Sequence, residues 1–191
     1  MRINKLYEKN DKGVFDYNLT DVEISGRSGF RDFDGTQKDI VCLGAAGTMG
    51  RFVHDPYPSL IENNSEYSVA NFGWGGVNEW DYNTPEFVDY INASRCCVYQ
   101  INSGRSTKNF DETFDLGGTR MSDRGPKLRD LYENNFSDFE SKAQKNKQEY
   151  LSCAKSFIKQ IKVPILFIFV SKYSLEDIDD TKKIPACIHL M

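Results

Sequence analysis

The sequence predicts a three-layer α/β domain, in which helices cover both faces of a parallel sheet of at least four strands. Two observations carry this prediction. Four short apolar runs are rich in β-branched and aromatic residues, as buried strands are, and helical patterns separate them. Strands that alternate with helices are joined by right-handed crossovers, which build a parallel sheet. With 191 residues, 39% of them hydrophobic, the chain fits one domain with a proper core.

The expected strands are short and largely apolar, as strands covered on both faces are. They are residues 39–44 (DIVCLG), 67–73 (YSVANFG), 96–102 (CCVYQIN) and 163–170 (VPILFIFV). Residues 1–38 are polar and contain several glycines. We therefore expect an irregular N-terminal lead-in over residues 1–38, followed by one α/β domain over residues 39–191.

Four helices are expected around these strands. The first covers residues 58–63. The second covers residues 84–94, with Thr84 as N-cap and Pro85 at the first helical position. The third covers residues 125–135 (GPKLRDLYENN). The last runs over residues 137–162 and opens with SDFE, where a serine and a glutamate have the spacing of a capping box.

Charge and composition exclude several classes of function. The net charge of −4 offers no electrostatic footprint for nucleic acid. No apolar run approaches the roughly 18 residues that a membrane helix needs, and the first residues lack the apolar core of a signal peptide. The five cysteines are an odd number, and three lie inside apolar runs, which favours buried thiols in a reducing compartment. We expect a cytoplasmic protein with no membrane partner.

Metal chemistry is not expected either. The chain has only two histidines, His54 and His189, and no cysteine spacing that is typical of zinc.

The strand ends indicate where a ligand site belongs. In a parallel sheet of this kind, ligands bind beyond the carboxyl ends of the strands. Here those ends are GAAGTMGR (44–51), NFGWGGVN (71–78), INSGRSTKN (101–109) and SKYS (171–174), and three of the four are polar and rich in glycine. We predict one depression at this edge, lined by Ala46, Thr48, Gly73, Gly76, Gln100 and Ser103.

The first of these loops admits a dinucleotide interpretation, in which Gly44, Gly47 and Gly50 cradle a pyrophosphate. Such a loop opens an uninterrupted helix, whereas Pro56 and Pro58 follow shortly after Gly50. The second strand also lacks a closing acid for the ribose. We therefore keep dinucleotide binding only as a lesser alternative and expect no nicotinamide, flavin or other cofactor.

The same loops resemble the motif blocks of the SGNH/GDSL hydrolases. GAAGT (44–48) resembles their first block, Gly-Asp-Ser-x-Thr, and NFGWGG (71–76) resembles the second, whose Asn-x-Gly turn donates to an oxyanion. VYQINSGRS (98–106) falls where their third block, Gly-x-Asn-Asp, stands. The resemblance implies a flavodoxin-like, SGNH-type sandwich with strand order 2-1-3-4.

A closer resemblance covers residues 30 to about 141. There the chain is similar to an uncharacterised bacterial family of SGNH-like proteins, a domain of unknown function. The residues that carry it are FRDFDG, LGAAGTMGRFVHDPYPSLIE, NFGWGGVNEW, VYQINSGRSTKNF and RGPKLRDLYENNFSDFE.

The chain departs from the SGNH pattern at the positions that perform the chemistry. The nucleophilic serine falls on Ala46 and the aspartate before it on Ala45. A methyl group cannot attack a carbonyl, since nucleophilic catalysis needs an activated hydroxyl beside a base. The Asp-x-x-His block is also absent, because none of the aspartates near the C-terminus stands three residues before His189. The resemblance thus implies a pseudoenzyme that is shortened at its C-terminus.

The first functional hypothesis is a diverged SGNH-like protein that binds a small polar or carbohydrate-like ligand. Glycine-rich turns supply backbone donors, arginines clamp anions, and neutral side chains at the end of the third strand add hydrogen bonds. The candidate binding residues are Gly44, Ala46, Thr48, Arg51, Asn71, Gly73, Gly76, Gln100, Ser103 and Arg105. Alternatively, Arg51 pairs only with Asp55, and Arg105 only with Asp111. Trp74 and Trp80 form either an aromatic wall for a sugar or part of the core.

The second hypothesis is an active enzyme, a carbohydrate esterase or acyltransferase that acts on ester bonds. Its nucleophile is then Ser103 or Ser106, supported by His54 as base. Ala46 favours the first hypothesis. A protein partner or a homo-oligomer stays open under both.

Overall fold

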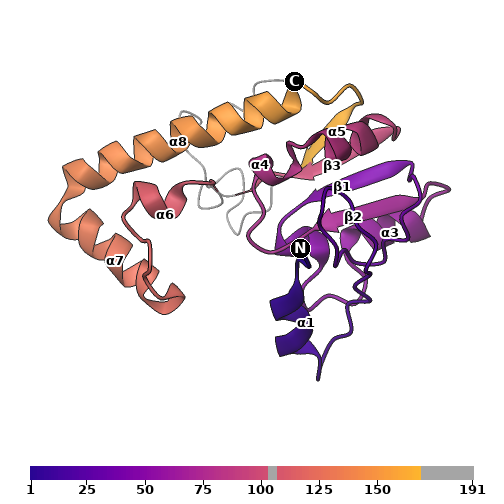
Figure 1. Cartoon of the computed structure of the whole chain (residues 1–191), viewed down its shortest axis with the longest axis horizontal. Coiled ribbons are helices and arrows are strands. Elements are labelled where there is room, and N and C mark those ends of the chain that lie inside the picture. The colour runs from indigo at the N-terminus through magenta and orange to yellow at the C-terminus, as the bar shows by residue number, and fades with distance from the viewer. Residues whose placement is uncertain (103–106, 169–191) are drawn as a thin grey trace.

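The computed structural model describes residues 1–102 and 107–168. Its centre is a four-stranded parallel sheet in the order β2-β1-β3-β4, which confirms the predicted fold class and strand order (Figure 1). The strands are β1 (Ile40–Gly44), β2 (Val69–Gly73), β3 (Cys96–Gln100) and β4 (Ile165–Ile168). In this register Val41 of β1 lies opposite Ala70 of β2 and Cys97 of β3.

Helices connect and cover these strands (Figure 1). They are α1 (Lys5–Asp11), α2 (Ala46–Met49), α3 (Tyr57–Asn63), α4 (Glu79–Tyr82), α5 (Pro85–Asn92), α6 (Phe110–Thr113), α7 (Met121–Asn134) and α8 (Phe136–Ile158). The four predicted helices correspond to α3, α5, α7 and α8. Among the described helices, none is both long and apolar enough to cross a membrane.

Thr84 is the N-cap of α5 and Pro85 its first residue, as predicted, whereas the predicted start of the last helix is wrong by one residue. The side chain of Thr84 makes no capping bond to α5, because its hydroxyl accepts a hydrogen bond from Ser25 at 2.8 Å instead. Helix α8 begins one residue earlier than expected, and its N-cap is Asn135, whose side chain accepts from the Asp138 N–H at 3.3 Å.

The larger part of the core lies on the face of the sheet that α5 and α8 cover. Phe72 of β2 packs edge-to-face against Phe87 of α5, with ring centroids 5.4 Å apart, and Tyr99 of β3 packs against Phe157 of α8. The opposite face carries a smaller cluster of Ile40, Cys42, Val69 and Val98, against which α3 packs Tyr57 and Ile61. These two layers hold the carboxyl ends of the strands in place between them.

The N-terminal segment contributes to the larger core cluster. Ile3, Phe30 and Phe33 are buried there, and the Phe30 ring lies 4.9 Å from that of Phe72 and 5.7 Å from that of Trp74. Apart from α1, the segment contains only isolated bridges, such as that between Arg2 and Ser28.

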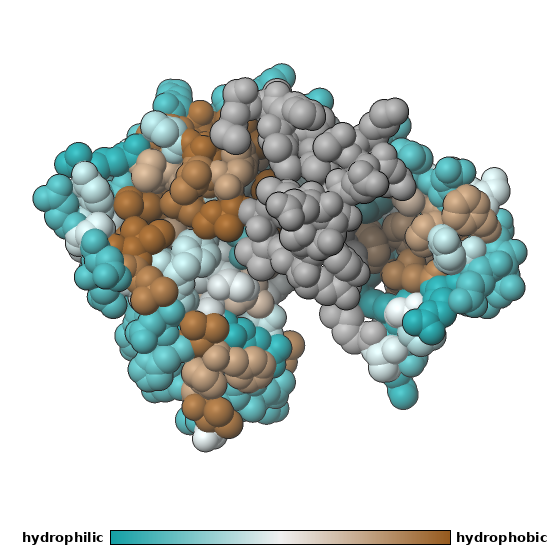
Figure 2. All heavy atoms as spheres, turned by 180° about the vertical axis from the view of Figure 1, so that it is seen from behind, coloured by the Kyte–Doolittle hydropathy of each residue, from teal (hydrophilic) through white to brown (hydrophobic). Residues whose placement is uncertain are grey.

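Helix α7 and the outer part of α8 form an arm that extends away from the sheet (Figure 1). Aromatic rings join the two helices, since Tyr132 of α7 lies 5.3 Å from Phe139 of α8. Seen from behind, the surface carries a broad apolar area on the sheet body and a smaller one on this arm (Figure 2).

Candidate functional site

The loop after β1 packs tightly at the carboxyl edge of the sheet. The hydroxyl of Thr48, fully buried in α2, donates to Oε1 of Gln100 at 2.6 Å and lies 3.1 Å from the hydroxyl of Tyr57. Gly44 is required beneath it, because a Cβ there would lie 2.1 Å from Oγ1 of Thr48. The structure therefore brings three predicted site residues, Gly44, Thr48 and Gln100, into one cluster.

Asn71 and Gly73 join β2 to the same cluster. The Gly73 N–H donates to Oδ1 of Asn71 at 3.0 Å, and Nδ2 of Asn71 donates to the Thr48 carbonyl at 3.0 Å. A Cβ on Gly73 would lie 2.2 Å from the backbone nitrogen of Met49, so this glycine lets α2 approach β2. The N–H expected to donate to a ligand is thus already bonded within the protein.

Ala46 and Gly76 lie nearer the surface than these residues. Ala46 is half-buried at the start of α2 and presents a methyl group there. Gly76 adopts a positive φ of 80°, and no atom lies within 4 Å of the place a Cβ would take. Both remain predicted ligand contacts.

Arg51 does not pair with Asp55. Its guanidinium binds the Asp11 carboxylate through two hydrogen bonds of 2.9 and 3.2 Å and lies over the Tyr7 ring, 4.2 Å from the centroid. An anionic ligand at Arg51 would have to compete with Asp11, since the pair holds the pKa of that carboxyl below its usual range.

The residues of the alternative catalytic site are only partly described. The His54 side chain is 94% exposed, with the Asp55 carboxylate 3.9 Å away. Ser103, Arg105 and Ser106 lie outside the described residues. Asp111, the expected partner of Arg105, binds Arg124 at 2.7 Å.

The two tryptophans do not form one wall. Trp74 is buried in the core between Phe30 and Tyr82. Trp80 is 49% exposed, and the Lys108 ammonium lies 4.6 Å from the centroid of its ring.

The helix after the glycine-rich loop is too short for the dinucleotide interpretation. Helix α2 has four residues and ends at Gly50, whose φ is 81°. Gly50 allows close packing, because a Cβ there would lie 2.4 Å from Cβ of Pro56. A pyrophosphate needs the dipole of a longer helix, so this loop favours packing over phosphate binding.

Sequence analysis missed a buried polar group on the α8 side of the sheet edge. Glu79, at the start of α4, is 1% exposed, and its Oε1 accepts a hydrogen bond from the Tyr99 hydroxyl at 2.5 Å. Asn102, just beyond β3, is 6% exposed, and neither its Oδ1 nor its Nδ2 has a hydrogen-bond partner. The Asn78–Asp81 capping box in NEWD signals a helix start, but nothing in the sequence says that its first acid is buried.

Sequence analysis also missed the structural role of Arg31, which is 7% exposed. Its guanidinium donates to the carbonyls of Gly50, Val53 and His54 at 3.1, 2.9 and 2.6 Å. Arg31 therefore fixes the backbone of the connection between α2 and α3.

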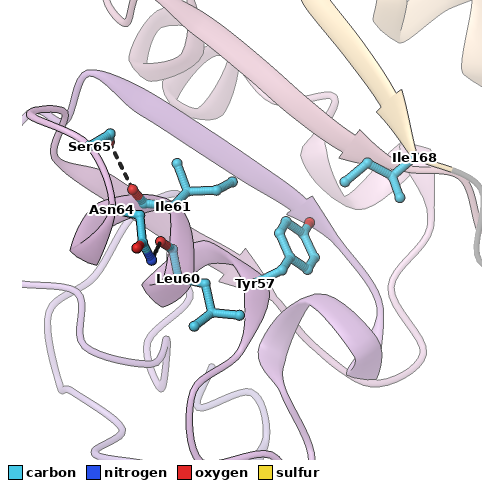
Figure 3. Close-up of a pocket in the computed structure, with 6 residues that line it drawn as sticks. All are labelled: Tyr57, Leu60, Ile61, Asn64, Ser65 and Ile168. Carbon is cyan, nitrogen blue, oxygen red and sulfur yellow. Dashed lines mark hydrogen bonds between the residues drawn. The ribbon is translucent and has the colours of Figure 1, made fainter.

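A groove of about 580 Å³ begins beside this edge, at Tyr57 and Ile168, and extends along α3 (Figure 3). Its apolar walls come from Tyr57, Leu60, Ile61 and Ile168. The polar groups on its rim are bonded locally, since Asn64 and Ser65 donate to the carbonyls of Leu60 and Ile61. The groove thus offers apolar contacts, while the side chains of Asn64 and Ser65 are already bonded to the backbone of α3.

Comparisons with known proteins give a family and a distant structural likeness. The family model described as a domain of unknown function (DUF6473) matches residues 6–144. A solved structure of a GDSL-like lipase from Bacteroides ovatus is similar with a TM-score of 0.34 and 16% identity, over 77% of this chain. The chain spans 46% of the length of that protein. No curated protein matches the chain.

Proposed function

Because the chain belongs to the family of the domain of unknown function DUF6473, its function has to be argued from the site itself. We propose that it is a diverged SGNH-like protein, which binds a small polar or carbohydrate-like ligand at the carboxyl edge of the sheet and does not hydrolyse esters through a serine of the first loop.

The observation that carries this proposal is the methyl group of Ala46 at the start of α2. A serine hydrolase needs a hydroxyl whose proton passes to a neighbouring base. The one hydroxyl in this loop, that of Thr48, is fully buried and donates to the neutral amide of Gln100. An amide does not accept a proton at neutral pH, so Thr48 is not activated.

Ligand binding is supported by the unpaired amide of Asn102 at the same edge. Leaving a buried polar group without a partner costs about 1–3 kcal/mol, and most buried polar groups are paired. A ligand that bonds this amide would recover that free energy. The half-exposed ring of Trp80 offers an apolar face of the kind on which sugar rings stack.

An assay of ester hydrolysis combined with a binding titration tests the proposal. We expect neither the wild-type chain nor Ala46→Ser to cleave p-nitrophenyl acetate above background, since a restored hydroxyl still lacks a base. We expect isothermal titration of the wild-type chain with N-acetylglucosamine to show saturable binding.

Two outcomes would contradict the proposal. Turnover by the wild-type chain that Ser103→Ala or Ser106→Ala abolishes would show the esterase alternative to be right. If neither glucose nor N-acetylglucosamine binds, the proposal that the ligand is carbohydrate-like is wrong.

A further inference from the structure

Glu79 and Asn102 converge on one buried place between α4, β3 and α8. Glu79 enters from the first position of α4, and Tyr99 donates to it from β3. The Tyr150 hydroxyl of α8 donates to the backbone carbonyl of Asn102 at 3.2 Å, which fixes the backbone of Asn102. The Asn102 amide lies beside the Glu79 carboxyl, and neither its nitrogen nor its oxygen has a hydrogen-bond partner.

Among the described residues, Glu79 has no cationic partner. The groups that face it are Tyr99 from β3, Asp81 from α4, and Cys153 from α8. Asp81 is itself paired with Arg27 at 3.0 Å. Within residues 1–102 and 107–168, no lysine, arginine or histidine forms an ion pair with Glu79. Burial consequently raises the pKa of Glu79, and Asp81 adds to the rise.

We propose that Glu79 and Asn102 form the part of the ligand site that selects uncharged ligands, with Glu79 donating as a carboxylic acid and Asn102 both donating and accepting. This inference rests on the proposed function, and it names the class of ligand and the groups that recognise it.

The chemistry of the two side chains defines that class. An acid hydroxyl supplies one donor, and the amide supplies two donors and one acceptor oxygen. Adjacent hydroxyls or an amide on the ligand match this set and bring no charge into a buried place. Among the described residues no cation is paired with Glu79, so a buried anion would lie beside an acid without a balancing charge, and a buried cation would require Glu79 to ionise. A neutral sugar with an acetamido group therefore fits better than its amino or carboxylate analogue.

Binding is then coupled to one proton. The bound state uses the acid form of Glu79, so affinity falls as pH rises through the raised pKa of this group. Above that pKa, one-proton linkage lowers the affinity about tenfold per pH unit.

Isothermal titration with three related sugars tests the inference: N-acetylglucosamine, glucosamine and glucuronate. The wild-type chain should bind N-acetylglucosamine at least about tenfold more tightly than the two charged analogues. Glu79→Gln, which keeps a neutral donor, should bind N-acetylglucosamine within about threefold of the wild-type affinity at low pH and lose the pH dependence. Glu133→Gln, an exposed substitution on α7, is the matched control and should leave both unchanged.

Asn102 is tested with two variants, because truncation of a buried residue can impair folding. Asn102→Ala and Asn102→Asp should each weaken binding of N-acetylglucosamine at least about tenfold, the second because a carboxylate has no N–H donors. Circular dichroism of both variants shows which of them is folded, and only a folded variant is used in the comparison.

The outcomes separate the two proposals. An affinity for N-acetylglucosamine that does not change with pH, in Glu79→Gln or in either Asn102 variant would mean that the ligand binds elsewhere. That result would overturn this inference alone. Equal binding of the charged sugars would also overturn it. The absence of binding by every sugar at every pH would overturn the proposed function and this inference with it.

Discussion

At the scale of single residues, the buried acid Glu79 makes stability depend on pH. Its pKa in the folded chain is raised above that of an unfolded glutamate, about 4.3. Its favourable contribution is therefore complete below the unfolded pKa and is lost as pH rises through the folded pKa. We expect the free energy of unfolding of Glu79→Gln, measured in urea, to improve relative to wild type as pH rises above the unfolded pKa of about 4.3. A difference that stays constant as pH rises would show that Glu79 titrates normally.

The hydrogen bonds of Arg31 predict a large loss of stability on substitution. Arg31→Met removes the donors that bind three backbone carbonyls of the α2–α3 connection, and each such bond to a charged group contributes about 1.5–3 kcal/mol. We expect the free energy of unfolding to fall by about 3 kcal/mol or more.

The matched control for Arg31 is Arg95→Met. Arg95 pairs with Asp39 at the surface with most of its side chain exposed, so its loss should cost about 0–1 kcal/mol. Equal effects of the two substitutions in urea denaturation would contradict the role given to Arg31.

Gly44 illustrates a glycine whose role is close packing. Its φ is 154°, and an added Cβ would meet Oγ1 of Thr48 at 2.1 Å and Cβ of Gln100 at 2.6 Å. Gly44→Ala should lower the free energy of unfolding by about 1–3 kcal/mol through overpacking. Gly117→Ala, where no atom lies within 4 Å, should change it by less than about 0.5 kcal/mol in the same thermal or urea experiment. A reversed order would mean that the Thr48 cluster is loose.

At the scale of elements, the strands could be predicted well because their runs are apolar on both faces. The four predicted ranges each contain the observed strand, and the glycines and polar residues that follow mark the strand ends. Side-chain capping bonds were harder to predict than the cap positions, because a side chain with capping chemistry can bond elsewhere. Thr84 shows this, since its hydroxyl bonds Ser25 from a segment 59 residues away in the chain.

The candidate site could be predicted only in outline. The topology placed Gly44, Thr48, Gly73 and Gln100 together, as the rule for parallel sheets requires. The sequence could not show that Thr48 and Gln100 bond each other, nor that Glu79 is buried. In the sequence, Glu79 is indistinguishable from an exposed acid in the first turn of a helix. Its burial depends on the contact with Tyr99 and on the packing of α8 against α4.

At the scale of the whole molecule, the sheet body and the helical arm should differ in stability. All five residues of β1 and of β2 are buried, whereas no described side chain of α7 is buried. Regions with few buried contacts open at a small cost in free energy. We expect amide hydrogens of α7 to exchange faster than those of β1 in native-state hydrogen exchange. Equal protection would mean that the arm and the sheet unfold as one unit.

The central claim for the molecule is that its sheet edge recognises a neutral ligand through a buried amide. Nuclear magnetic resonance of the Asn102 side-chain amide, assigned through its loss in Asn102→Asp, tests this claim most directly. On titration with N-acetylglucosamine at a pH where Glu79 is protonated, we expect this signal to shift saturably, with the dissociation constant that calorimetry gives. A signal that stays in place throughout the titration would contradict the claim.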